Sequence, residues 1–158
     1  MSNVDYDLLQ SQLRALLSGE TDTLAATSNF VALLFTALAD INWLGVYALR
    51  ADELVLGPFQ GKPACAHIPI GNGVCGVAAS TRRTQRVADV HEFPGHIICD
   101  ADSRSELVVP LQVDGELIGV LDIDSPSTAR FSNADQHGIE QLCAAFCDML
   151  PHGNGRFI

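Results

Sequence analysis

Helical periodicity at both ends of the chain encloses a strand-rich centre, and this order limits the possible folds more than any other feature. Leucines at helical spacing run through residues 3–18, and Gly19 ends the pattern. A second helix is predicted from Thr23 to about Ala39 with Asp22 as its N-cap, and a last one from about Asn133 to Leu150. We therefore expect an α+β domain, with the N- and C-terminal helices packed on one face of an antiparallel sheet.

The strands are predicted by short apolar runs separated by turn residues. Two pairs should form hairpins, one around Arg50-Ala51-Asp52 and one around Asp114-Gly115. The predicted strands are Trp43–Leu49, Glu53–Leu56, Ala66–Ile68, Arg86–Ala88, Glu106–Gln112 and Glu116–Asp124. About six strands are thus expected. No repeat or linker interrupts them, so residues 1–158 are interpreted as one domain with a helical segment at 3–18 and a tail at 151–158.

Composition excludes several classes of function. The chain has 158 residues, 47% of them apolar, and a formal charge of −10. Such an acidic protein repels phosphate backbones and anionic lipid, so we expect neither nucleic acid nor a membrane as a partner. The N-terminus lacks the basic flank and apolar core of a signal peptide. These features predict a cytosolic protein, in which thiols are normally reduced and disulfides are transient and catalytic.

Three of the five cysteines occur in segments rich in glycine and proline: Cys65 in GKPAC, Cys75 in GNGVCG and Cys99 in FPGHIICD. These segments are interpreted as loops, where thiols are accessible to ligands and to one another. Cys99 is the candidate nucleophile, because His96 and Asp100 beside it can shift its pKa. Cys65 and Cys75 both remain candidates to condense with a sulfenic acid on Cys99.

A zinc site and a plain structural role are the competing interpretations of these cysteines. His67 and His96 lie near cysteines, but no pair has the spacing of a structural zinc site, so we expect no metal and no other cofactor. Cys143 and Cys147 lie four residues apart on an apolar helix face. Small buried side chains explain both, and they are assigned no chemistry.

Acidic residues end the last predicted strand. Asp122 and Asp124 share a face with Val120, which indicates a core that opens into a pocket. If the hairpin loop has three residues, with Gly115 in a bulge, Glu106 faces Asp122 and joins them. A two-residue loop would place Glu106 on the opposite face. We favour the three-residue loop; the alternative for Asp122 and Asp124 is a solvated strand end.

Two aromatic residues lie on one face of the first strand. Trp43 and Tyr47 are four residues apart, so their side chains point the same way. They form either one wall of a small-ligand pocket or part of the core. Three carboxyl groups beside such a wall would raise one another's pKa, and the partly protonated cluster could bind an ammonium group or donate a hydrogen bond.

Taken together, these segments resemble those of a known enzyme family. The runs INWLGVY, GPFQGKPAC, IPIGNGVCG, VADVHEFPGHIICDADSRSELVVP and GVLDIDS are similar to the free methionine-(R)-sulfoxide reductases, which have a GAF fold, over roughly residues 20–150. The resemblance implies that Cys99 attacks the substrate and that Cys65 and Cys75 are resolving partners, Cys65 being the more usual one. It also implies that Glu106, Asp122 and Asp124 are the pocket acids, and Trp43 and Tyr47 the aromatic wall.

The implied reaction is reduction of free methionine-(R)-sulfoxide, through a sulfenic acid and an intramolecular disulfide that thioredoxin reduces. The resemblance also makes a homodimer possible. The alternative is a GAF sensor that binds a small ligand without catalysis, and a redox switch that reacts only with peroxide is a third. Consumption of free methionine-(R)-sulfoxide with thioredoxin or dithiothreitol distinguishes the reductase from both.

Overall fold

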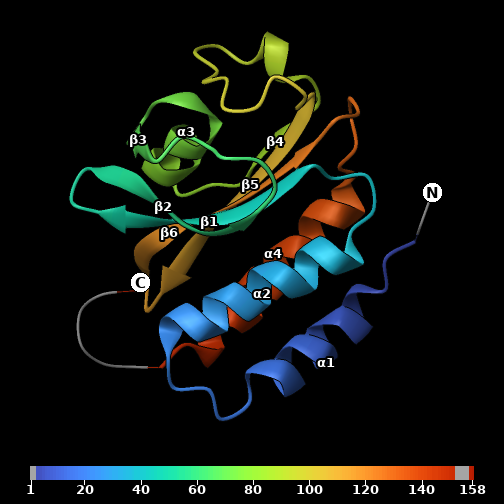
Figure 1. Cartoon of the computed structure of the whole chain (residues 1–158), viewed down its shortest axis with the longest axis vertical. Coiled ribbons are helices and arrows are strands. Elements are labelled where there is room, and N and C mark those ends of the chain that lie inside the picture. The colour runs from blue at the N-terminus through green and yellow to red at the C-terminus, as the bar shows by residue number, and fades with distance from the viewer. Residues whose placement is uncertain (1–2, 152–156) are drawn as a thin grey trace.

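The chain folds into three layers, with a central sheet between a group of three helices and one short helix. The computed structural model describes residues 3–151 and 157–158. Figure 1 shows α1, α2 and α4 together on one side of the sheet and α3 on the other. The elements in chain order are α1 (Tyr6–Leu17), α2 (Thr23–Ala37), β1 (Trp43–Arg50), β2 (Glu53–Gln60), β3 (His67–Pro69), α3 (Gly73–Thr81), β4 (Gln85–Val87), a short 3₁₀ helix η1 (Val90–Glu92), β5 (Ser105–Val113), β6 (Glu116–Ser125) and α4 (Asn133–Met149).

Helices α2 and α4 begin where the sequence predicts, whereas α1 begins at Tyr6, three residues inside the predicted segment 3–18. Asp5, Asp22 and Ser132 each accept a hydrogen bond from the backbone N–H three residues later, and this satisfies a free donor of the first turn. Ser132 also forms a reciprocal capping box with Asp135. The predicted helices at both ends of the chain are therefore confirmed.

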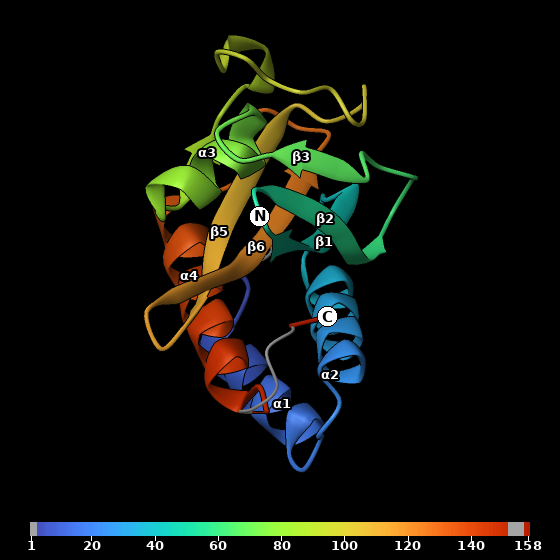
Figure 2. The same cartoon turned by 90° about the vertical axis from the view of Figure 1, so that its left-hand side faces the viewer.

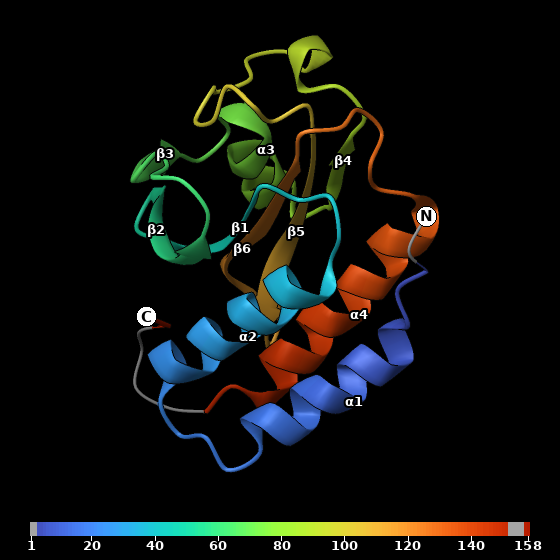
Figure 3. The same cartoon turned by 45° about the vertical axis from the view of Figure 1, so that its right-hand side comes forward.

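The six strands form one antiparallel sheet in the order β3-β2-β1-β6-β5-β4. Alternation along the three central strands divides their side chains between two cores. Leu44, Leu107 and Leu121 point toward the three long helices, where Phe30 of α2 stacks on Phe146 of α4. Figure 3 shows α1 lying outside α4 and α2, so these two helices form the layer next to the sheet. The α+β fold with terminal helices on one face is confirmed.

The short helix α3 covers the other face and was not predicted. It packs over Tyr47 and Val108, and Figure 2 shows it on the side of the sheet away from the long helices. Cys75 lies in its first turn and is buried, so the prediction of an accessible loop thiol is wrong for this cysteine. Glycine at position 76 allows the helix to approach the preceding turn, because a Cβ there would lie 2.7 Å from the carbonyl oxygen of Pro69.

The register of β5 against β6 also differs from the prediction. The loop has two residues, Asp114 and Gly115, both with positive φ, and not the three residues favoured from sequence. A bulge then leaves Ile118 as an extra residue on β6. The shorter loop and the bulge each move the pairing by one residue relative to the prediction. Glu106 is therefore opposite Asp124 and not Asp122. Glu106 still lies on the face of both aspartates, because the short loop and the bulge compensate for each other.

Within residues 3–151 and 157–158, no helix has the length and apolarity that a membrane span requires. The predicted tail at 151–158 lies partly outside the described residues, since 152–156 are not among them.

Candidate active site

The sheet face beneath α3 brings together the acids predicted from sequence. Glu106 comes from β5 and Asp122 and Asp124 come from β6, next to one another across the strand pair. All three line one cavity together with Tyr47 of β1 and Cys75 of α3. Glu106 and Asp122 are each only 6% exposed, and Asp124 is partly buried. A solvated strand end is therefore the wrong interpretation of these aspartates, and a pocket at the strand end is the right one.

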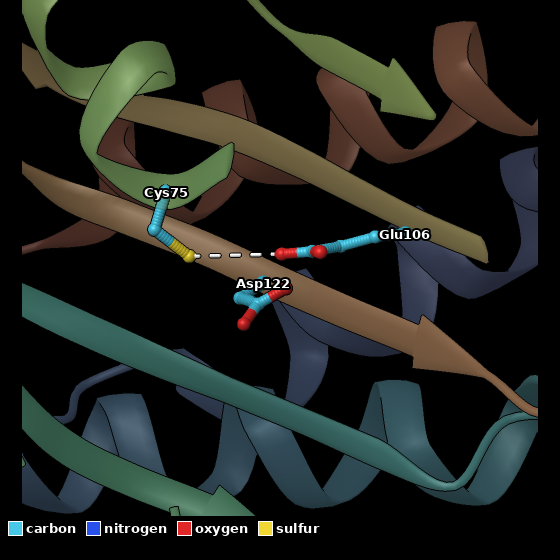
Figure 4. Close-up of side chains that lie close together, drawn as sticks. All are labelled: Cys75, Glu106 and Asp122. Carbon is cyan, nitrogen blue, oxygen red and sulfur yellow. Dashed lines mark hydrogen bonds between the residues drawn. The ribbon is translucent and has the colours of Figure 1, made fainter. Parts of the chain in front are cut away.

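At the base of the cavity a thiol meets two carboxyl groups. The Cys75 thiol points at Glu106 Oε1 across 3.9 Å, and the Asp122 side chain lies next to both (Figure 4). Asp122 Oδ1 is buried and has no hydrogen-bond partner in the described part of the chain. An unpartnered buried oxygen of this kind is costly for folding, and a hydrogen-bond donor on a ligand would satisfy it.

Burial favours the protonated forms of these acids. Desolvation raises the pKa of Glu106, and the negative charge of Asp124 raises it further. Desolvation likewise raises the pKa of Asp122, with Glu106 as the next cause, and the pKa of Asp124, with Asp122 as the next cause. Burial and then Asp122 raise the pKa of the Cys75 thiol. The cavity can therefore donate hydrogen bonds from carboxyl groups above the pH at which exposed carboxyl groups ionise.

Cys75, Glu106 and Asp122 are also the side chains of this cavity that lie close enough together to hold a metal ion. Sγ of Cys75 and one oxygen each of Glu106 and Asp122 all lie within 4.8 Å of one another. A metal requires deprotonated ligands, whereas this environment raises the pKa of all three. The set fits a proton-holding pocket better than a divalent cation site.

The other two predicted cysteines form a disulfide at the edge of the cavity. Cys65 follows β2 and Cys99 lies in the segment after η1, and their sulfur atoms are bonded with a Cα–Cα distance of 5.6 Å. Both are partly exposed, whereas Cys75 is free and buried. This is the pairing that the family resemblance implies. In this state the cavity retains about 30 Å³ of free space, enough for two or three water molecules at roughly 10–15 Å³ each.

The aromatic pair supports the segment that carries Cys65. Tyr47 lines the cavity, and its hydroxyl donates to the carbonyl oxygen of Cys65 at 2.9 Å. Trp43 lies behind Tyr47, with the ring centroids 5.9 Å apart, and its indole Nε1 donates to the carbonyl oxygen of Lys62 at 3.0 Å. In this disulfide state, the structure places Tyr47 at the predicted wall, with Trp43 in a supporting position behind it.

The structure adds residues that the sequence did not assign to the site. His96 lines the cavity, and its Nε2 lies 3.7 Å from Glu106 Oε2. Asn72 and Gly73 bring the start of α3 to the same space, and Asn72 makes no side-chain cap hydrogen bond. Asp100 and Ser103, from the segment that carries Cys99, also line the cavity. The side-chain amide of Asn42 donates hydrogen bonds to both of them. The signal for His96 was its position three residues before Cys99.

Comparisons with known proteins agree with this geometry. The GAF domain model matches residues 12–147. The chain is 54% identical over 139 residues to the free methionine-R-sulfoxide reductase of Escherichia coli, covering 88% of this chain and 84% of that one. The solved fRMsr of Staphylococcus aureus in complex with substrate is 51% identical, with a TM-score of 0.90 over 95% of this chain and 98% of that one.

A second solved relative is the free methionine-R-sulfoxide reductase from Neisseria meningitidis in complex with its substrate. It is 41% identical, with a TM-score of 0.88 over 94% of this chain and 92% of that one. The identity extends over most of both chains, and the fold agrees along its length. The chain therefore belongs to the free methionine-R-sulfoxide reductase family of GAF-domain oxidoreductases.

Proposed function

We propose that this protein reduces free methionine-(R)-sulfoxide to methionine, with Cys99 as the nucleophile and Cys65 as the resolving cysteine. The observation that carries the proposal is the Cys65–Cys99 disulfide beside a cavity walled by Glu106, Asp122 and Asp124. A non-catalytic sensor has no need of a disulfide at the edge of its ligand pocket. The substrate complexes of the two solved relatives support the choice of substrate.

The first step transfers oxygen from the substrate to the enzyme. The Cys99 thiolate attacks the sulfoxide sulfur while a protonated carboxyl group donates to the sulfoxide oxygen and makes that sulfur electrophilic. The sulfur–sulfur bond formed in this attack and the S–O bond of the substrate then both break as the oxygen moves to the sulfur of Cys99, so methionine leaves and Cys99 becomes a sulfenic acid. Substrate sulfur is reduced and the sulfur of Cys99 is oxidised.

The second step forms the disulfide. The thiol of Cys65 attacks the sulfur of Cys99, the S–O bond of the sulfenic acid breaks, and the oxygen leaves as water. Overall, one sulfoxide and two thiols give methionine, one disulfide and water. Cys75 is the weaker candidate for this step, because it is buried in α3 and its pKa is raised.

The raised pKa values of the acids allow them to serve both the ammonium group and the sulfoxide oxygen of the substrate. An incoming ammonium group lowers the pKa of the carboxyl groups next to it, so one can ionise and pair with it while another keeps its proton for the sulfoxide oxygen. The substrate carboxylate is expected on backbone N–H groups of the Cys99 segment. The first turn of α3 adds the positive end of a helix at the same cavity. A site that engages both charged ends excludes methionine within a polypeptide.

Thioredoxin in the cytosol is the proposed reductant. The partial exposure of Cys65 and Cys99 supports this, because thiol–disulfide exchange requires access to one sulfur of the bond. A homodimer is also proposed. Its support is the exposure of Leu8 (55%) and Leu16 (44%) on the outer face of α1.

Cysteine variants test the proposal. Cys99→Ser should abolish consumption of free methionine-(R)-sulfoxide. Cys65→Ser should retain one turnover, measured as one methionine per chain in a rapid quench, but lose cycling with thioredoxin. Cys143→Ala is the matched control, because that cysteine is buried in α4 away from the cavity, and it should cycle normally. Turnover by Cys99→Ser would refute the assignment of the nucleophile.

A further inference from the structure

His96 is a cavity residue that the proposed reaction, as written above, does not use. It follows the turn Phe93-Pro94-Gly95, and its backbone N–H donates to the carbonyl oxygen of Phe93 at 3.2 Å. Its side chain is 14% exposed to solvent and lies beside Glu106, whose side chain is 8% exposed. It is the one imidazole among the described residues that line the cavity.

The contact between His96 and Glu106 suits proton transfer. Nε2 of the ring lies 3.7 Å from Oε2 of Glu106. This is longer than a direct hydrogen bond, but a small rotation of the ring or one bridging water closes the gap, and catalytic contacts often tighten only with substrate bound. An imidazole can accept a proton on one nitrogen and release one from the other. Burial lowers the pKa of His96, which keeps the ring neutral and able to accept a proton near neutral pH.

The reaction creates a need for such a carrier. Reduction of a sulfoxide by two thiols consumes no net proton, but it moves protons within the site. The acid that protonates the sulfoxide oxygen gives up a proton, while Cys99 loses one on becoming a thiolate. Glu106 is a buried acid in this cavity, and it must regain its proton in every cycle if it supplies one.

Resting on the function proposed above, we propose that His96 is a proton-transfer residue that acts through Glu106: in each turnover its ring takes up a proton from solvent and passes one to the carboxylate of Glu106. Other titratable groups line the same cavity and set the field around the ring. They are Glu106 on β5, Asp122 and Asp124 on β6, Cys75 on α3, Tyr47 on β1, and Cys99 and Asp100 on the segment of His96 itself.

Three variants and two readouts test the proposal. His96→Ala removes the ring, His96→Gln retains a hydrogen-bond donor that cannot transfer protons, and His67→Ala is the matched control. His67 pairs with Glu53 at 3.0 Å in a second histidine–carboxylate contact, on the exposed surface. With excess dithiothreitol, both His96 variants should lose about tenfold or more in kcat with little change in KM, and free imidazole should restore part of the His96→Ala rate. The control should match the wild type.

A double-mutant cycle shows whether His96 acts through Glu106. His96→Ala should lower kcat less than twofold in a Glu106→Gln background, because the proton that His96 supplies is then no longer used. Equal losses in both backgrounds would overturn the proposal. So would wild-type kcat in His96→Gln, or a loss in His96→Ala that imidazole does not rescue. Absence of turnover in the wild type would instead refute the proposed function, so the two failures are distinguishable.

Discussion

Three carboxyl groups lie on one sheet face in the interior of the protein, where side chains are usually apolar. Glu106, Asp122 and Asp124 lie where Val108 and Val120 continue the same face as core. Each buried carboxyl group loses hydration, and Asp122 Oδ1 gains no hydrogen bond within the described residues. A stable fold alone would place apolar side chains here. The acids therefore indicate a site in which stability is given up for proton chemistry.

The pKa of Glu106 gives a prediction for stability. Below about pH 4.5, its usual value, both folded and unfolded chains hold the proton. Above that pH the unfolded chain ionises freely while the folded one resists, so the free energy of unfolding falls until the raised folded pKa is passed. Urea titrations of the disulfide form between pH 4.5 and 8 should therefore show a steeper fall for the wild type than for Glu106→Gln.

The control for that titration is Glu116→Gln, because Glu116 is exposed at the start of β6. Its profile should follow the wild type. Parallel profiles for Glu106→Gln and the wild type would mean that Glu106 ionises as easily in the folded protein as in the unfolded one.

At the scale of elements, local signals were predictable from sequence and compensating distortions were not. The caps of α2 and α4 are each encoded within four residues, so both helix starts were found. The bulge at Ile118 has no local signature, because it depends on how β6 packs between β5 and β1. Helix α3 was missed because its nine residues are small, lack apolar periodicity and are preceded by glycines.

The contact between α1 and α4 gives a prediction at this scale. Tyr6 of α1 donates to Asp135 at 2.6 Å, and its ring lies directly over Gly138 of α4. Alanine favours a helix over glycine by about 1 kcal/mol, but a Cβ at Gly138 would overlap the ring. We expect Gly138→Ala to lower the free energy of unfolding by about 1–3 kcal/mol through overpacking, measured in urea.

Combining Gly138→Ala with Tyr6→Ala separates the overlap from other effects. Removal of the ring leaves room for the new methyl group, so Gly138→Ala should become neutral or stabilising in the Tyr6→Ala background. An unchanged cost there would mean that the overlap is not its cause.

At the scale of the molecule, the structure holds the Cys65–Cys99 disulfide with which the proposed cycle ends. The Cys65–Cys99 disulfide joins two loops at the edge of the cavity, and Lys62 pairs with Asp102 across the same two segments at 2.6 Å. The family resemblance predicted which acids and aromatic residues belong to the site, but the burial of Cys75 follows only from the way the segments pack. In the proposed cycle, reduction of this disulfide precedes the binding of a new substrate.

Substrate binding should therefore depend on redox state. The disulfide form should show no heat of binding with methionine-(R)-sulfoxide in calorimetry, because its cavity has only about 30 Å³ of free space. Cys99→Ser, which can form no such disulfide and cannot attack, should bind. The fluorescence of Trp43, the one tryptophan, should also change on reduction, since its indole is bonded to the Cys65 segment. Equal binding to both forms would contradict this dependence on redox state.

The most direct test of the account is a disulfide map after one turnover. Reduced protein is mixed with one equivalent of free methionine-(R)-sulfoxide in the absence of reductant, quenched with a thiol-blocking reagent and digested for mass spectrometry. We predict one methionine released per chain, a Cys65–Cys99 disulfide, and blocked thiols on Cys75, Cys143 and Cys147. Methionine release with Cys99 still a free thiol, or with Cys75 in its disulfide, would contradict the account.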